Sequence, residues 1–163
     1  MVRRSGFVFL LLLLGLSLSV SIRAGELETV TNILARESAP VGVVFEMVGG
    51  DADSLNIALR RTEAYVTKLR RKFPDANYVI VTHGLEQFSL LEHSKGDFPE
   101  LHQRVDNMVK EQNIPIHVCG ALAEMSGLDT KDFIKSVEVA DSGPLQIQEY
   151  VEKGYVLVEM ELH

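Results

Sequence analysis

The sequence predicts an α/β fold, a three-layer α/β/α sandwich built around a mainly parallel sheet of five strands. Short apolar runs rich in β-branched residues alternate with helical patterns five times along the chain. Strands that are separated by helices are joined by crossovers, which make the strands parallel and cover the sheet on both faces. The chain holds no internal repeat and no low-complexity linker, so residues 41–163 are expected to form one domain.

The first strand is expected at residues 41–47, followed by a glycine turn at 49–51. Asp53 or Ser54 then caps a long helix that ends at Pro74. One face of this helix is basic, and we expect it to be solvated rather than to bind a partner. Its apolar residues recur at steps of three and four and form one stripe: Leu55, Leu59, Val66, Leu69 and Phe73.

The second strand, residues 78–82, leads directly into His83. Residues 85–96 show no clean period and predict a long loop, or a loop with one irregular turn, of the kind that often covers a site. Asp97 caps the next helix, which has Pro99 in its first turn and runs to about Gln112.

The third strand is expected at 114–118 and leads into Cys119. A short helix follows at 120–126, and the fourth strand lies at 137–140. Residues 142–144 then begin a helix that Gly154 closes, and the last strand covers 155–160.

The first 24 residues differ in kind from the rest. Arg3 and Arg4 provide a positive start, an almost unbroken apolar run follows at 7–16, and residues 22–24 fit a signal-peptidase site. This pattern predicts an export signal cleaved after Ala24, and hence a periplasmic or secreted protein. A retained anchor is the alternative, although the apolar stretch is shorter than the roughly 20 residues of a spanning helix. Residues 25–40 are expected to form a short leading helix or a mobile arm.

The chain is acidic, with a formal net charge of −7. Without residues 1–24, which hold three arginines and no acid, 13 basic and 23 acidic side chains remain, a net charge of −10. Nucleic acid and anionic membranes repel such a protein, so neither is expected as a partner. The single cysteine, Cys119, cannot form an internal disulfide. In an oxidising compartment, we expect this thiol to be buried, paired with another chain or kept for a reaction.

The candidate site lies where the parallel strands end, because ligands of open α/β sheets bind at that edge. His83 ends the second strand and Cys119 the third, and His117 shares a face with Cys119 two positions away. A nearby imidazole and a helix N-terminus both favour the thiolate, so these three residues are candidates for sulfur chemistry. Five residues are expected to line the ligand-binding edge with their backbone: Gly49, Gly50, Gly84, Gly120 and Ala121.

The same residues also have structural interpretations. Cys119 could fill core as a small hydrophobe, and His117 could be a core residue within its apolar strand. His93 and His102 are expected at the surface. The spacings match no structural zinc motif, and we expect no metal or cofactor, although His83, His117 and Cys119 could together bind a soft metal such as copper.

The order of these motifs resembles the DsrE/DsrF family over residues 41 to 160. The resemblance implies a three-layer α/β fold, trimers or hexamers, and sulfur trafficking in which a cysteine after a central strand carries a persulfide. Cys119 matches that cysteine by position. The matching pieces are Asn56-Ile57-Ala58-Leu59, Thr82-His83-Gly84, His117-Val118-Cys119-Gly120, Gly127-Leu128, residues 137–143 and residues 152–155.

We therefore expect an exported, oligomeric sulfur carrier that works with a sulfur-donor or acceptor protein. Cys119 would accept sulfane sulfur as a persulfide, while His83, and less directly His117, promote the thiolate or orient the incoming group. The amides of Gly120 and Ala121 would stabilise negative charge on sulfur. The alternative is a non-catalytic oligomeric protein of the same fold that binds a small ligand or metal at this edge.

Overall fold

The computed structural model describes residues 25–162. Within them, one sheet has the strand order β4-β3-β2-β1-β5, and every neighbouring pair is parallel. The strands are β1 (Gly42–Met47), β2 (Asn77–Thr82), β3 (Ile116–Cys119), β4 (Glu138–Ala140) and β5 (Tyr155–Met160). The α-helices are α1 (Glu26–Ala35), α2 (Ala52–Lys72), α3 (Pro99–Lys110), α4 (Gly120–Met125) and α5 (Gly143–Glu152).

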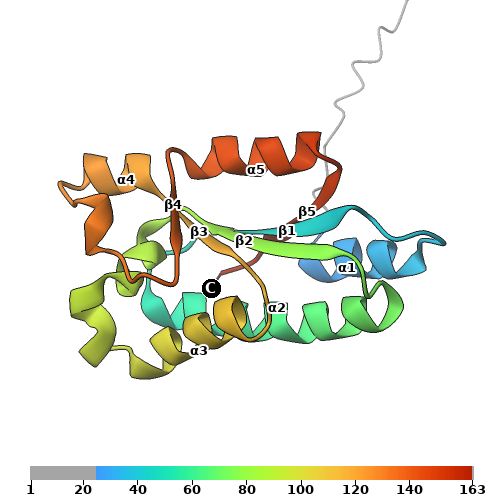
Figure 1. Ribbon diagram of the computed structural model, residues 1–163, viewed down its shortest axis with the longest axis horizontal. Helices are drawn as coiled ribbons and strands as arrows, with labels where there is room; N and C mark the ends of the chain where they lie inside the picture. The colour runs from blue at the N-terminus through green and yellow to red at the C-terminus, as the bar shows by residue number, and fades with distance from the viewer. Residues whose placement is uncertain (1–24, 163) are drawn as a thin grey trace, which may run out of the picture.

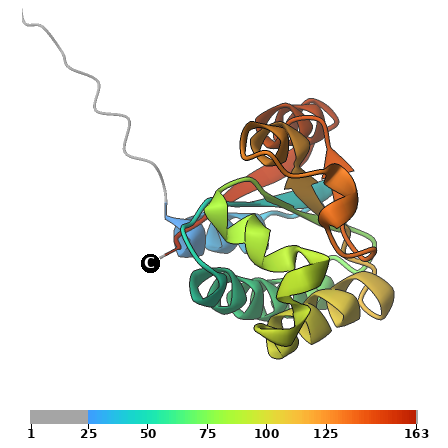
Figure 2. The ribbon, with the colours of Figure 1, turned by 90° about the vertical axis from the view of Figure 1, so that its left-hand side faces the viewer.

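Helices cover the sheet on both faces (Figure 1). In this view α1, α2 and α3 lie below the sheet, and α5 lies above it with α4 at one end. The side view shows the same layers (Figure 2). The chain crosses the sheet from β1 through β2 and β3 to β4, and then returns past β1 to β5. The predicted three-layer sandwich is thus confirmed, and its sheet is parallel throughout.

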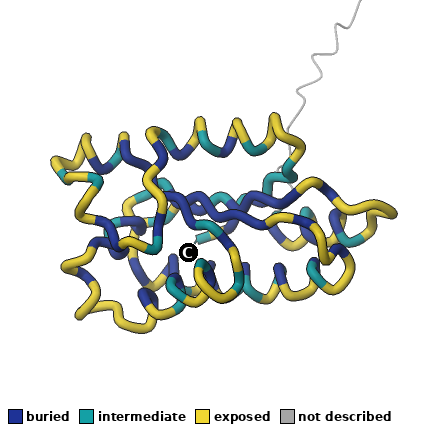
Figure 3. Tube along the Cα trace, in the orientation of Figure 1, coloured by how far each residue is buried: buried dark blue, intermediate teal, exposed yellow. Residues whose placement is uncertain are grey.

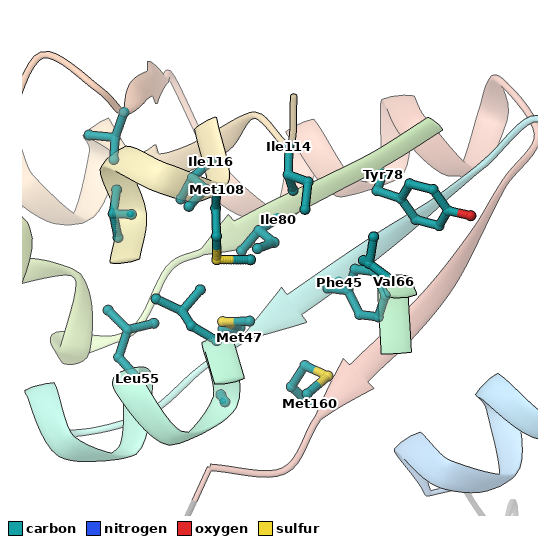
Figure 4. Close-up of a cluster of buried hydrophobic side chains, with 14 of the residues drawn as sticks. Phe45, Met47, Leu55, Val66, Tyr78, Ile80, Met108, Ile114, Ile116 and Met160 are labelled. Carbon is teal, nitrogen blue, oxygen red and sulfur yellow. The ribbon is translucent and has the colours of Figure 1, made fainter. Parts of the chain in front are cut away.

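The larger core lies between the sheet and the helices below it (Figure 4). Phe45, Ile80 and Ile116 project from three adjacent strands and pack with Leu55 of α2 and Met108 of α3; all are almost fully buried. Burying a side chain of this size stabilises the fold by about 1.5–3 kcal/mol. Figure 3 shows the result, with burial running along the strands and exposure on the outer sides of the helices.

A smaller cluster fills the space between the sheet and α5. Val44, Val79 and Val81 of the strands meet Ile147 of α5 there. Because side chains alternate along a strand, Glu46 lies on this same face, two residues beyond Val44. The α5 side therefore changes from apolar to polar toward the carboxyl ends of the strands.

Residues 85–96 contain two 3₁₀ helices instead of a long loop: η1 (Leu85–Leu90) and η2 (Glu92–Gly96). Such short 3₁₀ segments do not produce the 3.6-residue pattern of an α-helix, which is why the sequence showed no period here. Leu90 is fully buried, and Leu91 forms an antiparallel bridge with Phe133. A third short 3₁₀ helix, η3, covers Thr130–Asp132.

Residues 25–40 contain the helix α1 (Glu26–Ala35), so the first of the two predicted alternatives, a short leading helix, is confirmed. Its first residue, Glu26, is buried and accepts a hydrogen bond from the Tyr65 hydroxyl at 3.0 Å. The same carboxylate accepts the backbone N–H of Glu161 at 2.9 Å. These bonds attach α1 to α2 and to the segment that follows β5.

Two helices begin at different caps from those expected. Asp51, rather than Asp53 or Ser54, caps α2, and its side chain accepts the Ser54 N–H at 2.8 Å. Phe98, rather than Asp97, is the N-cap of α3. Before α2 several adjacent polar residues compete for the cap, and the turn decides between them. Before α3 the residue expected as the cap, Asp97, is instead the C-cap of η2, so the helix begins one residue later.

Among residues 25–162, no helix combines the length and apolar character needed to cross a membrane. The predicted export signal at residues 1–24 lies outside the described residues.

Candidate functional site

His83 and Cys119 flank one point at the carboxyl edge of the sheet. That point is Gly143, the first residue of α5. A β carbon added to Gly143 would lie 2.5 Å from Cβ of His83 and 3.4 Å from Cβ of Cys119. Because both distances start from the same point, Cβ of His83 and Cβ of Cys119 can be no further apart than the two distances added together. The structure therefore brings together the two strand-end residues that the sequence singled out.

Cys119 is a buried, reduced cysteine whose backbone is firmly held. It ends β3, serves as the N-cap of α4, and is 5% exposed. Its N–H donates to Oε1 of Gln87 at 2.8 Å, and Nε2 of Gln87 donates to its carbonyl at 3.2 Å. The Gln87 amide thus fixes the backbone from which the thiol projects.

The imidazole of His83 is oriented by a carboxylate from the neighbouring strand. Its Nε2 lies 2.8 Å from Oε1 of Glu46, and both side chains are mostly buried. The N–H of His83 also donates to the Met47 carbonyl at 3.1 Å, which extends the pairing of β1 and β2. A histidine held by a carboxylate in this way has a fixed ring orientation, as general bases of nucleophilic enzymes do.

His117 shares the α5-facing side of β3 with Cys119, as predicted, but its ring nitrogens have other neighbours. Nε2 is 2.9 Å from the Tyr150 hydroxyl on α5, and Nδ1 is 3.5 Å from Oε2 of Glu138. Burial lowers the pKa of His117 below its ordinary value, and the Glu138 carboxylate opposes this effect. His117 is thus placed to bind α5 to the sheet.

The predicted glycine edge divides into two parts. Gly49 and Gly84 lie together on the β1 and β2 side, where both of their N–H groups donate to the buried carboxylate of Glu86, at 2.6 and 2.9 Å. The Thr82 hydroxyl donates to the same carboxylate. Glu86 therefore occupies the backbone donors that were expected to meet a ligand, whereas Gly50 is exposed and has open space around it.

Gly120 and Ala121 lie on the other part, beside β4. The N–H of Ala121 donates to the Asp141 carbonyl at 3.0 Å, so it does not serve a sulfur anion as expected. Gly120 packs closely on β4, since a β carbon there would lie 3.0 Å from the Ala140 carbonyl oxygen. Together with Asp141, these residues line a small hollow of about 240 Å³.

Besides α4, which Cys119 itself caps, α5 also begins against the thiol residue. In this helix of ten residues the first N–H groups have no intrahelical acceptors and carry partial positive charge, although Pro144 in the first turn has no N–H to contribute. Gly143 is buried at this start, beside Cys119 and His83. A glycine is needed there because a larger residue would collide with His83.

Sequence reasoning missed three contributors to this edge, Glu46, Glu86 and Gln87, and it gave no role to Gly143, although the ends of the strands were expected to meet there. Glu46 interrupts an apolar strand with a charge, and the Gly143-Pro144 pair marks a helix start; these were the available signals. The prediction that His102 lies at the surface was wrong: it is 3% exposed because α3 turns it against η1, where Nε2 is 2.8 Å from the Ser89 carbonyl. His93 is exposed, as expected.

The copper hypothesis required three side chains to converge. Within residues 25–162, no group of three or more His, Cys, Asp or Glu residues is arranged to hold a metal ion. His83, His117 and Cys119 therefore do not form such a group in this structure.

Comparison with known proteins supports the fold. No protein-family model matches the chain, and no curated protein matches its sequence. A similar solved structure is that of MTH1491, a protein of unknown function from Methanobacterium thermoautotrophicum, with a TM-score of 0.58 and 17% identity. The match covers 72% of this chain and 96% of that one. At this identity the likeness establishes a shared α/β architecture.

Proposed function

We propose that this protein is an exported sulfur carrier, which accepts sulfane sulfur as a persulfide on Cys119 and passes it to a partner. The observation that supports this most directly is the convergence of Cys119 and the Glu46-held His83 on Gly143. Thiolate, oriented imidazole and helix start are the components of an activated sulfur nucleophile.

The chemistry balances without an external oxidant. With thiosulfate as donor, the Cys119 thiolate attacks the outer sulfur, and an S–S bond forms between Sγ and that sulfur. The original S–S bond breaks, and its electron pair leaves with sulfite. His83 takes the thiol proton before the attack, and no redox cofactor is required.

Export and assembly complete the proposal. The pattern of residues 1–24 supports secretion with cleavage after Ala24, which would leave Gly25, the N-cap of α1, as the first residue. The resemblance to the DsrE/DsrF family supports homo-trimers or hexamers.

A second function is favoured by the burial of Cys119. A thiol that is 5% exposed also suits a non-catalytic oligomeric protein that binds a small ligand at the same edge, with the cysteine as part of the wall. The two functions differ in whether the native thiol reacts.

Sulfur loading tests the proposal. The purified protein is incubated with thiosulfate and its intact mass is measured; we expect a species one sulfur atom heavier that reductant removes. Cys119→Ser cannot form it, and His83→Gln forms it at least about tenfold more slowly. Glu149→Gln, on the exposed side of α5, is the matched control and loads normally.

Thiol labelling of the same samples makes the result decisive. If the native thiol reacts with a small alkylating reagent but never acquires sulfur, the carrier function is rejected. If it neither loads nor reacts until the protein is denatured, the binding function is the better description.

A further inference from the structure

A second cavity lies away from Cys119, between η2, α3 and the segment before β4. Its volume is about 270 Å³, enough for a small inorganic anion but below the range of most drug-sized ligand pockets. In Figure 2 η2 and α3 lie side by side on the face toward the viewer. None of the residues proposed for sulfur transfer lines this cavity.

Positive charge gathers here on a protein that is acidic overall. Lys95 of η2, Lys110 of α3 and Lys135 before β4 come from three separate segments and line the same cavity. Two carboxylates also line it, Glu92 and Asp106. The cavity therefore has one positive charge in excess on a chain whose formal net charge is −7.

Asp106 is already occupied by other groups. Its carboxylate accepts the Ser136 hydroxyl and lies 3.1 Å from Nζ of Lys110. These two contacts, the hydroxyl first, lower the pKa of Asp106 below its ordinary value. Asp106 therefore holds Lys110 and Ser136 in place, whereas Lys135 has no hydrogen-bond or ion-pair partner among residues 25–162.

His102 also lines the cavity, and one nitrogen of its buried ring has no hydrogen-bond partner among the described residues. Its Nε2 lies 2.8 Å from the Ser89 carbonyl, and because a carbonyl only accepts, Nε2 carries the hydrogen. In the neutral ring Nδ1 is then an acceptor. This atom is buried, and no described residue gives it a hydrogen bond. A buried acceptor without a donor is uncommon and points to a missing molecule or group.

We propose that this cavity binds a small oxyanion that still carries a hydrogen, of which hydrogen phosphate is the common example. The lysines neutralise the anion, and its hydroxyl supplies the donor that Nδ1 of His102 lacks. At a pH of about 7.5 a phosphate monoester has lost its last acidic hydrogen, and sulfate has none. Both should therefore bind more weakly than free phosphate.

Calorimetric titration of the purified protein at constant ionic strength tests this. Inorganic phosphate is expected to bind up to about tenfold more tightly than sulfate or methyl phosphate, the gain of one well-made hydrogen bond. Lys135→Gln should weaken all three anions several-fold. Lys131→Gln, a lysine of η3 outside the cavity that pairs with Asp129, is the matched control and should change nothing.

His102→Gln isolates the buried acceptor. The Gln amide keeps a donor for the Ser89 carbonyl but removes Nδ1, so the preference for phosphate over sulfate should vanish while binding of both persists. No saturable binding of phosphate, equal affinity for phosphate and sulfate, or an equal loss in the Lys131 and Lys135 variants would each overturn the proposal. If His102→Gln does not fold, the three anions and the two lysine variants still decide it.

Discussion

Gln87 binds both backbone groups of Cys119, accepting its N–H at 2.8 Å and donating to its carbonyl at 3.2 Å. A single side-chain amide thus replaces the two hydrogen bonds that another strand would give to the last residue of β3. Gln87 is fully buried in η1, so this connection links the segment between β2 and α3 to the candidate nucleophile.

Replacing Gln87 with Leu should destabilise the fold by about 1–3 kcal/mol, because the N–H and carbonyl of Cys119 are left without partners. The end of β3 should also loosen, so the native thiol should react faster with an alkylating reagent. Urea unfolding and labelling rates measure the two effects. Gln103→Leu, at an exposed position of α3, is the control. Unchanged unfolding in the Gln87 variant would contradict the role assigned to this amide.

Gly143→Ala should destabilise the protein by about 1–3 kcal/mol through overpacking, since the new methyl group would lie 2.5 Å from Cβ of His83. We also expect slower sulfur loading, because relief of the collision moves His83 away from Cys119. Thermal unfolding and loading rates measure these effects. Gly50→Ala, at the same edge but with no atom within 4 Å of its added carbon, should leave both unchanged within error.

The carboxylate of Glu86 accepts three hydrogen bonds: one from the Thr82 hydroxyl at the end of β2, and two from the N–H groups of Gly49 and Gly84 in the loops after β1 and β2. Glu86→Gln should cost about 3 kcal/mol, because an amide has one acceptor oxygen and turns its NH₂ toward a backbone N–H. The expected result is a lower urea midpoint, with Glu124→Gln at an exposed site of α4 as control. If Glu86→Gln unfolds at the same urea concentration as the wild type, the structure around these two loops does not depend on the charge of Glu86.

The position of the candidate site could be predicted from sequence because it follows from topology. Alternating strands and helices make the sheet parallel, and a parallel sheet collects its strand ends at one edge. His83 and Cys119 stand at strand ends, so their approach required no knowledge of side-chain packing.

The contacts of these residues could not be predicted in the same way, since they join distant parts of the chain. Glu46 reaches His83 across the β1–β2 pair, and Gly143 meets both site residues only because α5 crosses the sheet. The burial of His102 depends on η1, a segment with no helical period to reveal it. The local sequence pattern therefore predicts which edge of the sheet holds the candidate site, whereas long-range packing determines which side chains contact His83 and Cys119.

The buried ring of His117 should make the fold sensitive to acid. Its pKa in the folded protein lies below the ordinary value of 6.5, first because burial disfavours the charged ring. The unfolded chain therefore binds a proton more readily than the folded one as the pH falls below about 6.5. The stability associated with neutral His117 is complete above that pH and is lost as the pH falls toward the folded-state pKa.

His117→Gln removes this titration while keeping an amide that can bond to the Tyr150 hydroxyl. Urea unfolding at several pH values between about 7.5 and 5 should show a steeper loss of stability in the wild type than in the variant. His93→Gln, at an exposed position, should follow the wild type. Parallel pH profiles for the wild type and His117→Gln would show that the ring gains its proton in the folded state as easily as in the unfolded chain, and that burial beneath α5 does not govern its charge.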